Sequence, residues 1–243
     1  MKRINKYVGI AIFAMIAFFA VNNNAKAQCQ EEGNCDPPYW SNNITYTFTY
    51  PMFPNCPLTA YYQTMNCDGK TYVRLSTISF PVDPQCNALM AWLIPNGLGT
   101  YAEAVNYFVL WREALNGIVK EQFEIIHDEN PLLYNCPETY PIISITGGGC
   151  NSVWTYYRPA AITHPVSLVW VRHVPCEPDG CCVTTKNMCW FNGVVIQLSE
   201  STQYVSTEDC TTLQPLYNPF EGFGPEWVDW GHTPCAASCY MEN

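Results

Sequence analysis

Basic side chains are scarce in this 243-residue sequence, which has 11 Lys and Arg against 21 Asp and Glu. Four of the basic residues lie in the first 27 positions, which hold no acidic residue, so residues 28–243 keep seven and a net charge near −14. A surface of this sign repels the phosphates of nucleic acids and the head groups of anionic lipids. The scarcity of positive charge therefore excludes a nucleic-acid-binding protein.

Motifs for catalysis and cofactor binding are also missing. No G-x-S-x-G segment supplies a serine nucleophile, and no two cysteines are spaced C-x-x-C as a zinc site would require. Histidine is rare and scattered, at His127, His164, His173 and His232. We expect no cofactor, no metal and no catalytic residue, which favours a protein that is not an enzyme.

The long apolar run of the chain lies at its N-terminus. It extends from Val8 to Val21, follows Lys2, Arg3 and Lys6, and precedes Ala25-Lys26-Ala27. This order is typical of a secretory signal peptide, whereas a membrane-spanning helix needs about 20 apolar residues. We therefore expect a signal peptide over 1–27 and a mature chain, residues 28–243, that is secreted or held at the cell surface without a membrane span.

Cysteine is abundant, and all 14 copies lie in residues 28–243. An even number in an oxidising compartment predicts up to seven disulfides, whose pairing cannot be read from the sequence. Cys181 and Cys182 are neighbours on a predicted strand, so they point to opposite faces and should have different partners. The cysteines are Cys29, Cys35, Cys56, Cys67, Cys86, Cys136, Cys150, Cys176, Cys181, Cys182, Cys189, Cys210, Cys235 and Cys239.

Alternating β-branched, aromatic and polar residues predict most of the chain to be strands. Asp68-Gly69 and Asn192-Gly193 each lie between two such runs and predict type I′ hairpin turns, because those residues tolerate positive φ. Pro51, Pro54 and Pro57 should end the first strand. The predicted strands are 44–50, 59–66, 71–80, 140–146, 152–158, 166–174, 181–191 and 194–205.

Two helices are predicted between the third and fourth strands, a short one over 87–94 and a long one from Tyr101 to before Pro131. Thr100 and Glu103 fit a capping box for the long helix. Its apolar residues recur every three or four positions, which places Arg112 and Asn116 on the opposite, polar side. His127 near its end suits the helix dipole.

Together these elements predict one α+β domain over 28–243, with one long amphipathic helix packed on a face of an antiparallel, disulfide-rich sheet. The last four strands follow one another and should form a meander. An irregular N-terminal arm precedes the sheet, and an irregular tail follows it from Glu208.

The tail holds a speculative ligand site at Glu226, Trp227, Asp229 and Trp230. Acids beside indole rings suit a sugar, although packing of the tail onto the core is the favoured explanation of the same rings. The first hypothesis for function is a non-enzymatic extracellular structural or adhesive protein, which would self-assemble or bind an extracellular partner. The alternatives are a secreted glycan- or small-ligand-binding module and, last, a secreted hydrolase with a dispersed active site.

Export of the full chain from a secreting host is expected to yield a protein that begins at Gln28. N-terminal sequencing and intact mass measure this directly, and Ala27→Lys should block the cleavage. Recovery of a chain that still carries residues 1–27 from the unsubstituted protein would contradict the signal-peptide prediction.

Overall fold

The computed structural model describes residues 40–94, 101–147, 149–163, 165–177, 180–205, 209–217, 219, 224–237 and 239. The signal peptide, Cys29, Cys35 and the capping residue Thr100 lie outside the described residues, so these predictions are not tested. No helix in the described ranges is long and apolar enough to cross a membrane.

Most predicted elements are present, with small shifts at their ends. Strands β7 and β8 and helix α3 begin and end where the pattern of the sequence placed them. The elements are β1 (Ile44–Tyr50), β2 (Phe53–Cys67), β3 (Lys70–Pro81), η1 (Pro84–Cys86), α2 (Asn87–Leu93), α3 (Tyr101–Glu129), β4 (Tyr140–Gly147), β5 (Cys150–Arg158), β6 (Leu168–Pro175), β7 (Cys181–Phe191), β8 (Val194–Val205), η2 (Cys210–Thr212), β9 (Val228–His232) and β10 (Ala236–Ala237).

Both predicted hairpin turns are confirmed by their backbone angles. Asp68 and Gly69 have φ of 50° and 71°, and Asn192 and Gly193 have φ of 51° and 83°. Positive φ at both central residues defines the type I′ turn, whose twist matches that of the strands it joins. The β2–β3 and β7–β8 hairpins are therefore specified locally by four residues.

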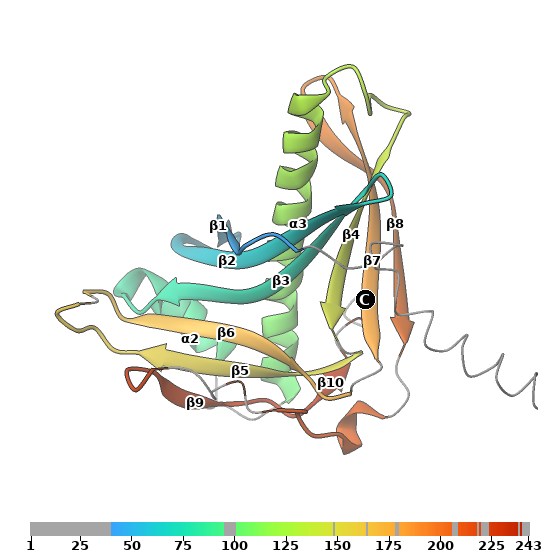
Figure 1. Cartoon of the computed structure of the whole chain (residues 1–243). Coiled ribbons are helices and arrows are strands. Elements are labelled where there is room, and N and C mark those ends of the chain that lie inside the picture. The colour runs from blue at the N-terminus through green and yellow to red at the C-terminus, as the bar shows by residue number, and fades with distance from the viewer. Residues whose placement is uncertain are drawn as a thin grey trace, which may run out of the picture.

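Strand β3 divides the sheet in two. One edge of β3 pairs antiparallel with β2, while the other edge pairs with β4 at Thr71–Val73 and with β6 at Ile78–Pro81. On one side of this fork the β5 wing continues through β6 to β5, which pairs with both β9 and β10. On the other side the β7 wing continues through β4, β7 and β8. Figure 1 shows the two wings running in different directions from β3.

The predicted antiparallel sheet and meander are therefore correct only in part. The sheet is mixed, because β3 and β4 are parallel, and their connection contains both α-helices, as a parallel crossover requires. Strand β4 pairs with β7 and not with β5, so the chain alternates between wings. Strand order in the sheet depends on long-range burial, which the alternation within each strand does not encode.

Two local predictions are correct only in part. The first strand does end before Pro51, as expected. Pro54 and Pro57 lie inside β2, where only the edge toward β1 is paired, since pairing with β3 starts at Thr59. A proline nitrogen is tolerated on such an unpaired edge. The tail is also not wholly irregular, because β9 and β10 pair with β5.

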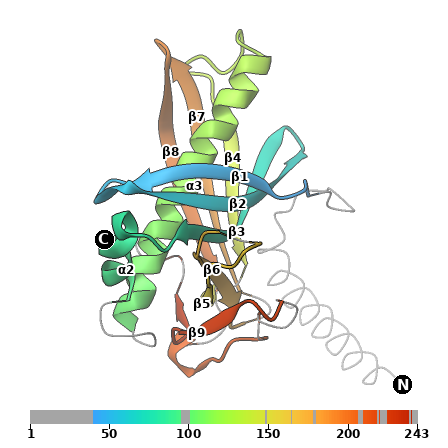
Figure 2. The same cartoon turned by 90° about the vertical axis from the view of Figure 1, so that its left-hand side faces the viewer.

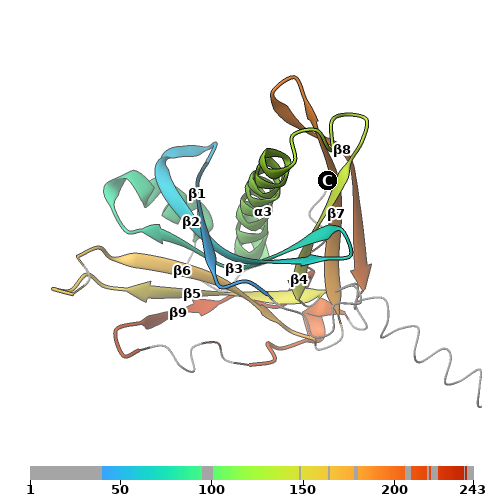
Figure 3. The same ribbon diagram turned by 45° about the horizontal axis from the view of Figure 1, so that its top comes forward.

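Helix α3 lies in the concave side of the bent sheet, with strands of both wings around it (Figures 2 and 3). Its buried residues therefore cover more than the single predicted stripe. Burial of a large apolar side chain is worth roughly 1.5–3 kcal/mol, so this helix carries much of the core. The buried helical residues are Tyr107, Phe108, Leu110, Trp111, Ala114, Ile118, Val119, Gln122, Phe123 and His127.

Polar contacts hold α3 against the sheet. The Gln122 amide donates to the Tyr62 hydroxyl of β2 (2.9 Å), and that hydroxyl donates to Glu121 (3.2 Å). Burial, with Glu121 adding to it, raises the pKa of Tyr62, so the phenol keeps its proton. On β5, the Thr155 hydroxyl donates to Tyr107 (3.2 Å). These bonds fix the rotation of the helix about its axis.

All twelve described cysteines are oxidised. The pairs are Cys56–Cys86, Cys136–Cys189, Cys150–Cys210, Cys176–Cys235 and Cys182–Cys239, and Cys67 and Cys181 are also disulfide-bonded. The prediction that Cys181 and Cys182 have different partners is confirmed. Cys182–Cys239 connects β7 to the chain just after β10, so it ties the two wings together.

Removal of Cys182–Cys239 by two Cys→Ser substitutions should lower the free energy of unfolding by about 4 kcal/mol, by the entropy of a closed loop of this length. Removal of Cys136–Cys189 is the matched control, since the sequence separations are 57 and 53. Urea unfolding should show similar losses. Hydrogen exchange should increase in β10 only without Cys182–Cys239, and equal exchange in both variants would contradict its role between the wings.

Candidate functional site

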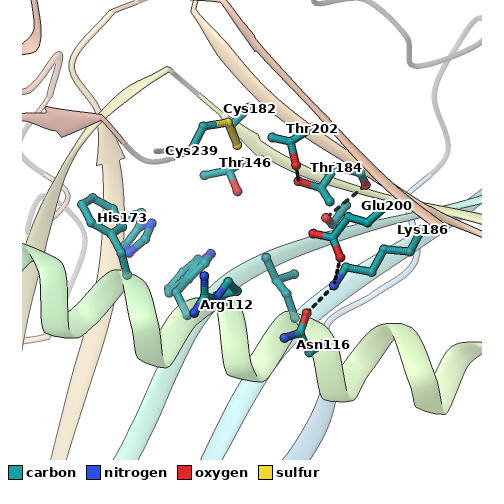
Figure 4. Close-up of a pocket in the computed structure, with 14 residues that line it drawn as sticks. Arg112, Asn116, Thr146, His173, Cys182, Thr184, Lys186, Glu200, Thr202 and Cys239 are labelled. Atoms are coloured by element: carbon teal, nitrogen blue, oxygen red, sulfur yellow. Dashed lines mark hydrogen bonds and ion pairs between the residues drawn. A yellow bond between two sulfur atoms is a disulfide. The ribbon is translucent and has the colours of Figure 1, made fainter. Parts of the chain in front are cut away.

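A pocket lies between α3 and the β7 wing (Figure 4). It is closed at one end by Cys182–Cys239 and by His173, which comes from β6 in the other wing. The cavity volume is about 70 Å³. A water molecule needs roughly 10–15 Å³, so the cavity admits several waters or one end of a small polar ligand.

Strand and helix periodicity bring the polar lining together. Cys182, Thr184 and Lys186 alternate along β7 and therefore share the face toward α3. Arg112 and Asn116 are four residues apart on α3, so they lie on one side of the helix. Arg112 is exposed and Asn116 is half-buried, as expected for the polar side of the helix, and both also line the pocket.

Lys186 is the central charged group of the pocket. Its ammonium lies 3.0 Å from the Glu200 carboxylate of β8 and donates to the Asn116 amide oxygen of α3. The side chain is only 8 % exposed. A lysine ammonium has three N–H donors, and these two partners leave one donor for a further group.

Hydroxyl groups line the wall formed by the β7 wing. Thr184 and Thr202 face each other across β7 and β8, with 3.1 Å between their hydroxyl oxygens. Thr146 of β4 adds a third hydroxyl, and Ser144 beside it donates to the Thr184 carbonyl (3.3 Å). Each hydroxyl can donate and accept, so this wall suits a ligand that carries hydroxyls of its own.

His173 forms the apolar end of the pocket. Its ring stacks on Trp111 at 3.7 Å between centroids and meets Phe108 edge-on at 4.9 Å. Part of the residue reaches solvent, but both ring nitrogens are buried and neither has a hydrogen-bond partner. Burial lowers the pKa of His173 to about 3 from its usual 6.5, so the imidazole is neutral at physiological pH.

The two tryptophans of the predicted tail site lie on opposite faces of the sheet. Trp227 is 8 % exposed and contacts Trp170, in a cluster with Trp154 on the outer face. Trp230 stacks on Tyr157 (4.6 Å) and packs against the core that surrounds α3. Each ring therefore has a packing role, as the favoured explanation of the tail expected.

The two acids of the tail site are exposed. Asp229 accepts from the backbone N–H of Gly231 (2.7 Å), and Glu226 lies at a turn just before Trp227. None of the four residues lines the pocket between α3 and the β7 wing. A ligand site in the tail stays a prediction.

His127 lies in the last turn of α3, as predicted, but it does not cap the helix with a hydrogen bond. The ring is buried and stacks on Trp190 of β7 at 4.4 Å between centroids. Neither ring nitrogen has a hydrogen-bond partner. Its contribution is packing between the last turn of α3 and the β7–β8 hairpin.

The pocket residues escaped prediction because they come from distant parts of the chain. The only signal was charge: two of the seven basic residues in 28–243, Arg112 and Lys186, lie in this one pocket. Among the described residues, no group of three or more His, Cys, Asp or Glu is placed to hold a metal ion. No protein-family model, curated protein or solved structure matches the chain.

Stability should depend on His173 at acidic pH. Its folded pKa lies below the unfolded value, so the unfolded chain binds the extra proton and stability falls as the pH decreases from about 6.5 toward 3. The contribution of His173 to the free energy of unfolding changes by at most about 1.4 kcal/mol per pH unit. His173→Phe, which keeps a ring on Trp111, should flatten the curve in urea unfolding. A curve that keeps its slope in His173→Phe would contradict this prediction.

Proposed function

We propose that this protein is an extracytoplasmic, non-enzymatic binding module, stabilised by disulfides, that holds a small polar ligand in the pocket between α3 and the β7 wing. The observation that carries the proposal is the Lys186 ammonium, held by Glu200 and Asn116 with one N–H left over, beside the hydroxyls of Thr146, Thr184 and Thr202. The disulfides are typical of proteins outside the cell.

The ligand class follows from the charges and hydroxyls. Among the described lining residues two are basic, Arg112 and Lys186, and one is acidic, Glu200, in a chain that is otherwise strongly acidic. An anionic group of the ligand would take the spare donor of Lys186, and ligand hydroxyls would pair with the threonines. A small polyhydroxylated acid, such as an acidic sugar, meets both requirements.

Binding fits the pocket better than catalysis does. In the described part of the chain, none of the three histidines is hydrogen-bonded to a carboxylate or a hydroxyl, whereas a nucleophile needs a base that is itself oriented. The lowered pKa of His173 also makes it a weak base. A secreted hydrolase with a dispersed active site gains no support from this arrangement.

Calorimetric titration with glucuronate and galacturonate, with glucose and galactose as neutral controls, tests the proposal. Acidic sugars should bind and neutral sugars should bind less, with affinity falling as salt rises. Lys186→Met should weaken binding by roughly 10- to 100-fold, since a hydrogen bond to a charged group is worth about 1.5–3 kcal/mol. Arg112→Gln should also weaken it without threatening the fold, because Arg112 is exposed.

Two further variants distinguish binding in the pocket from binding elsewhere on the protein. Lys120→Met removes an exposed charge from the same helix outside the pocket and should leave affinity unchanged. Trp230→Ala tests the tail site of Glu226, Trp227, Asp229 and Trp230. Absence of binding to every sugar acid, or binding that is lost with Trp230→Ala but kept with Arg112→Gln, would overturn the pocket proposal.

A structural or adhesive role is the second candidate. It is favoured by the oxidation of all twelve described cysteines, including one pair that ties the two wings together. A domain of this size can form a substantial hydrophobic core without disulfides. The high number of disulfides therefore suits a protein that must persist under harsh conditions. If the ligand titrations show no binding while the oxidised protein forms regular assemblies, this candidate takes precedence.

A further inference from the structure

Two of the three asparagine–glycine pairs in this chain lie in opposite surroundings. Asn192-Gly193 forms the tip of the β7–β8 hairpin, at one end of the molecule in Figure 1, and Asn116-Gly117 lies inside α3. The third pair, Asn96-Gly97, lies outside the described residues. The backbone nitrogen after an asparagine can attack the side-chain amide of that asparagine, and glycine favours this reaction because it has no side chain to hinder the approach.

The pair at the hairpin tip is open to this reaction. Asn192 and Gly193 are both exposed, and the pairing of β7 with β8 starts beyond them, at Phe191 and Val194. A Cβ atom on Gly193 would have no neighbour within 4 Å, so the space around its backbone is empty of protein atoms. The Gly193 nitrogen can therefore approach the Asn192 side chain without breaking the ladder of hydrogen bonds between the strands.

The pair in the helix is held away from this reaction. Gly117 lies inside α3, where its N–H donates to the backbone carbonyl one turn earlier. The Tyr46 ring covers Gly117, and the amide oxygen of Asn116 accepts from the Lys186 ammonium. Reaction at Asn116 therefore requires local opening of α3 and loss of the contact with Lys186.

We propose that Asn192 is a modification site, at which the folded protein deamidates without an enzyme, while the fold protects Asn116. The Gly193 nitrogen loses its proton to a base in solution and bonds to the side-chain carbon Cγ of Asn192, and the amide nitrogen leaves as ammonia. Water then opens the cyclic imide at either of its carbonyls, which gives aspartate or isoaspartate. In sum, an amide and water give a carboxylate and ammonium.

The two products have different effects on the hairpin. Aspartate keeps the turn, because Asp68-Gly69 of the same chain forms it with φ of 50° and 71°, against 51° and 83° at Asn192-Gly193. Isoaspartate puts an extra carbon into the backbone, which a type I′ turn does not accommodate. Below the tip the strands stay in place, since Cys136–Cys189 ties β7 to the loop before β4. Modification therefore alters the tip and leaves the pocket intact.

Peptide mapping by mass spectrometry tests this site on the oxidised mature protein after incubation for weeks at neutral and at mildly alkaline pH. Asn192 should lose its amide more than about tenfold faster than Asn116, because reaction at Asn116 requires local opening of α3. Isoaspartate should appear beside aspartate at position 192. Both products should form faster at the higher pH, since the attacking nitrogen must lose its proton.

The reduced protein in urea is the matched control, because both pairs have apolar neighbours, F-N-G-V at 191–194 and L-N-G-I at 115–118. Without the fold the two asparagines should react at similar rates, so a difference in the folded protein comes from its structure. Digestion at acidic pH prevents reaction during the preparation of the peptides. Loss of the amide at Asn116 as fast as at Asn192 in the folded protein, or aspartate at position 192 without isoaspartate, would overturn the proposal.

Discussion

One edge of β3 serves two strands, and the rest of the structure depends on that division. Because β4 takes Thr71–Val73 and β6 takes Ile78–Pro81, the two wings cannot continue as one flat sheet and must diverge. The divergence produces the concave side that holds α3. A helix enclosed in this way buries Tyr107, Gln122 and His127 as well as its predicted apolar stripe.

The same fork explains why the pocket has lining from both wings. His173 reaches it from β6, while the threonines and Lys186 reach it from the β7 wing. Helix α3 supplies the remaining wall and, through Asn116, holds the Lys186 ammonium in place. Gly117 of α3 lets the helix lie close to β1, because the Tyr46 ring occupies the space where a side chain at position 117 would be.

Features that depend on a few neighbouring residues could be predicted from the sequence. Asp68-Gly69 and Asn192-Gly193 predicted their turns because few other residues accept positive φ, and the spacing of apolar residues predicted α3. The parallel pairing of β3 with β4 could not be predicted, since it joins strands separated by two helices. Strand β9 escaped notice because Val228–His232 is held by pairing with β5 and not by its own alternation. The pocket depends on all of these long-range placements.

The order of the disulfides along the chain has a consequence for survival outside the cell. The spans 136–189, 150–210, 176–235 and 182–239 overlap without a gap. A single cut by a protease anywhere between Cys136 and Cys239 therefore leaves the two fragments covalently joined. Strands β4 to β10, which hold most of the pocket lining, lie within that interval, so the protein can be nicked there without shedding a segment.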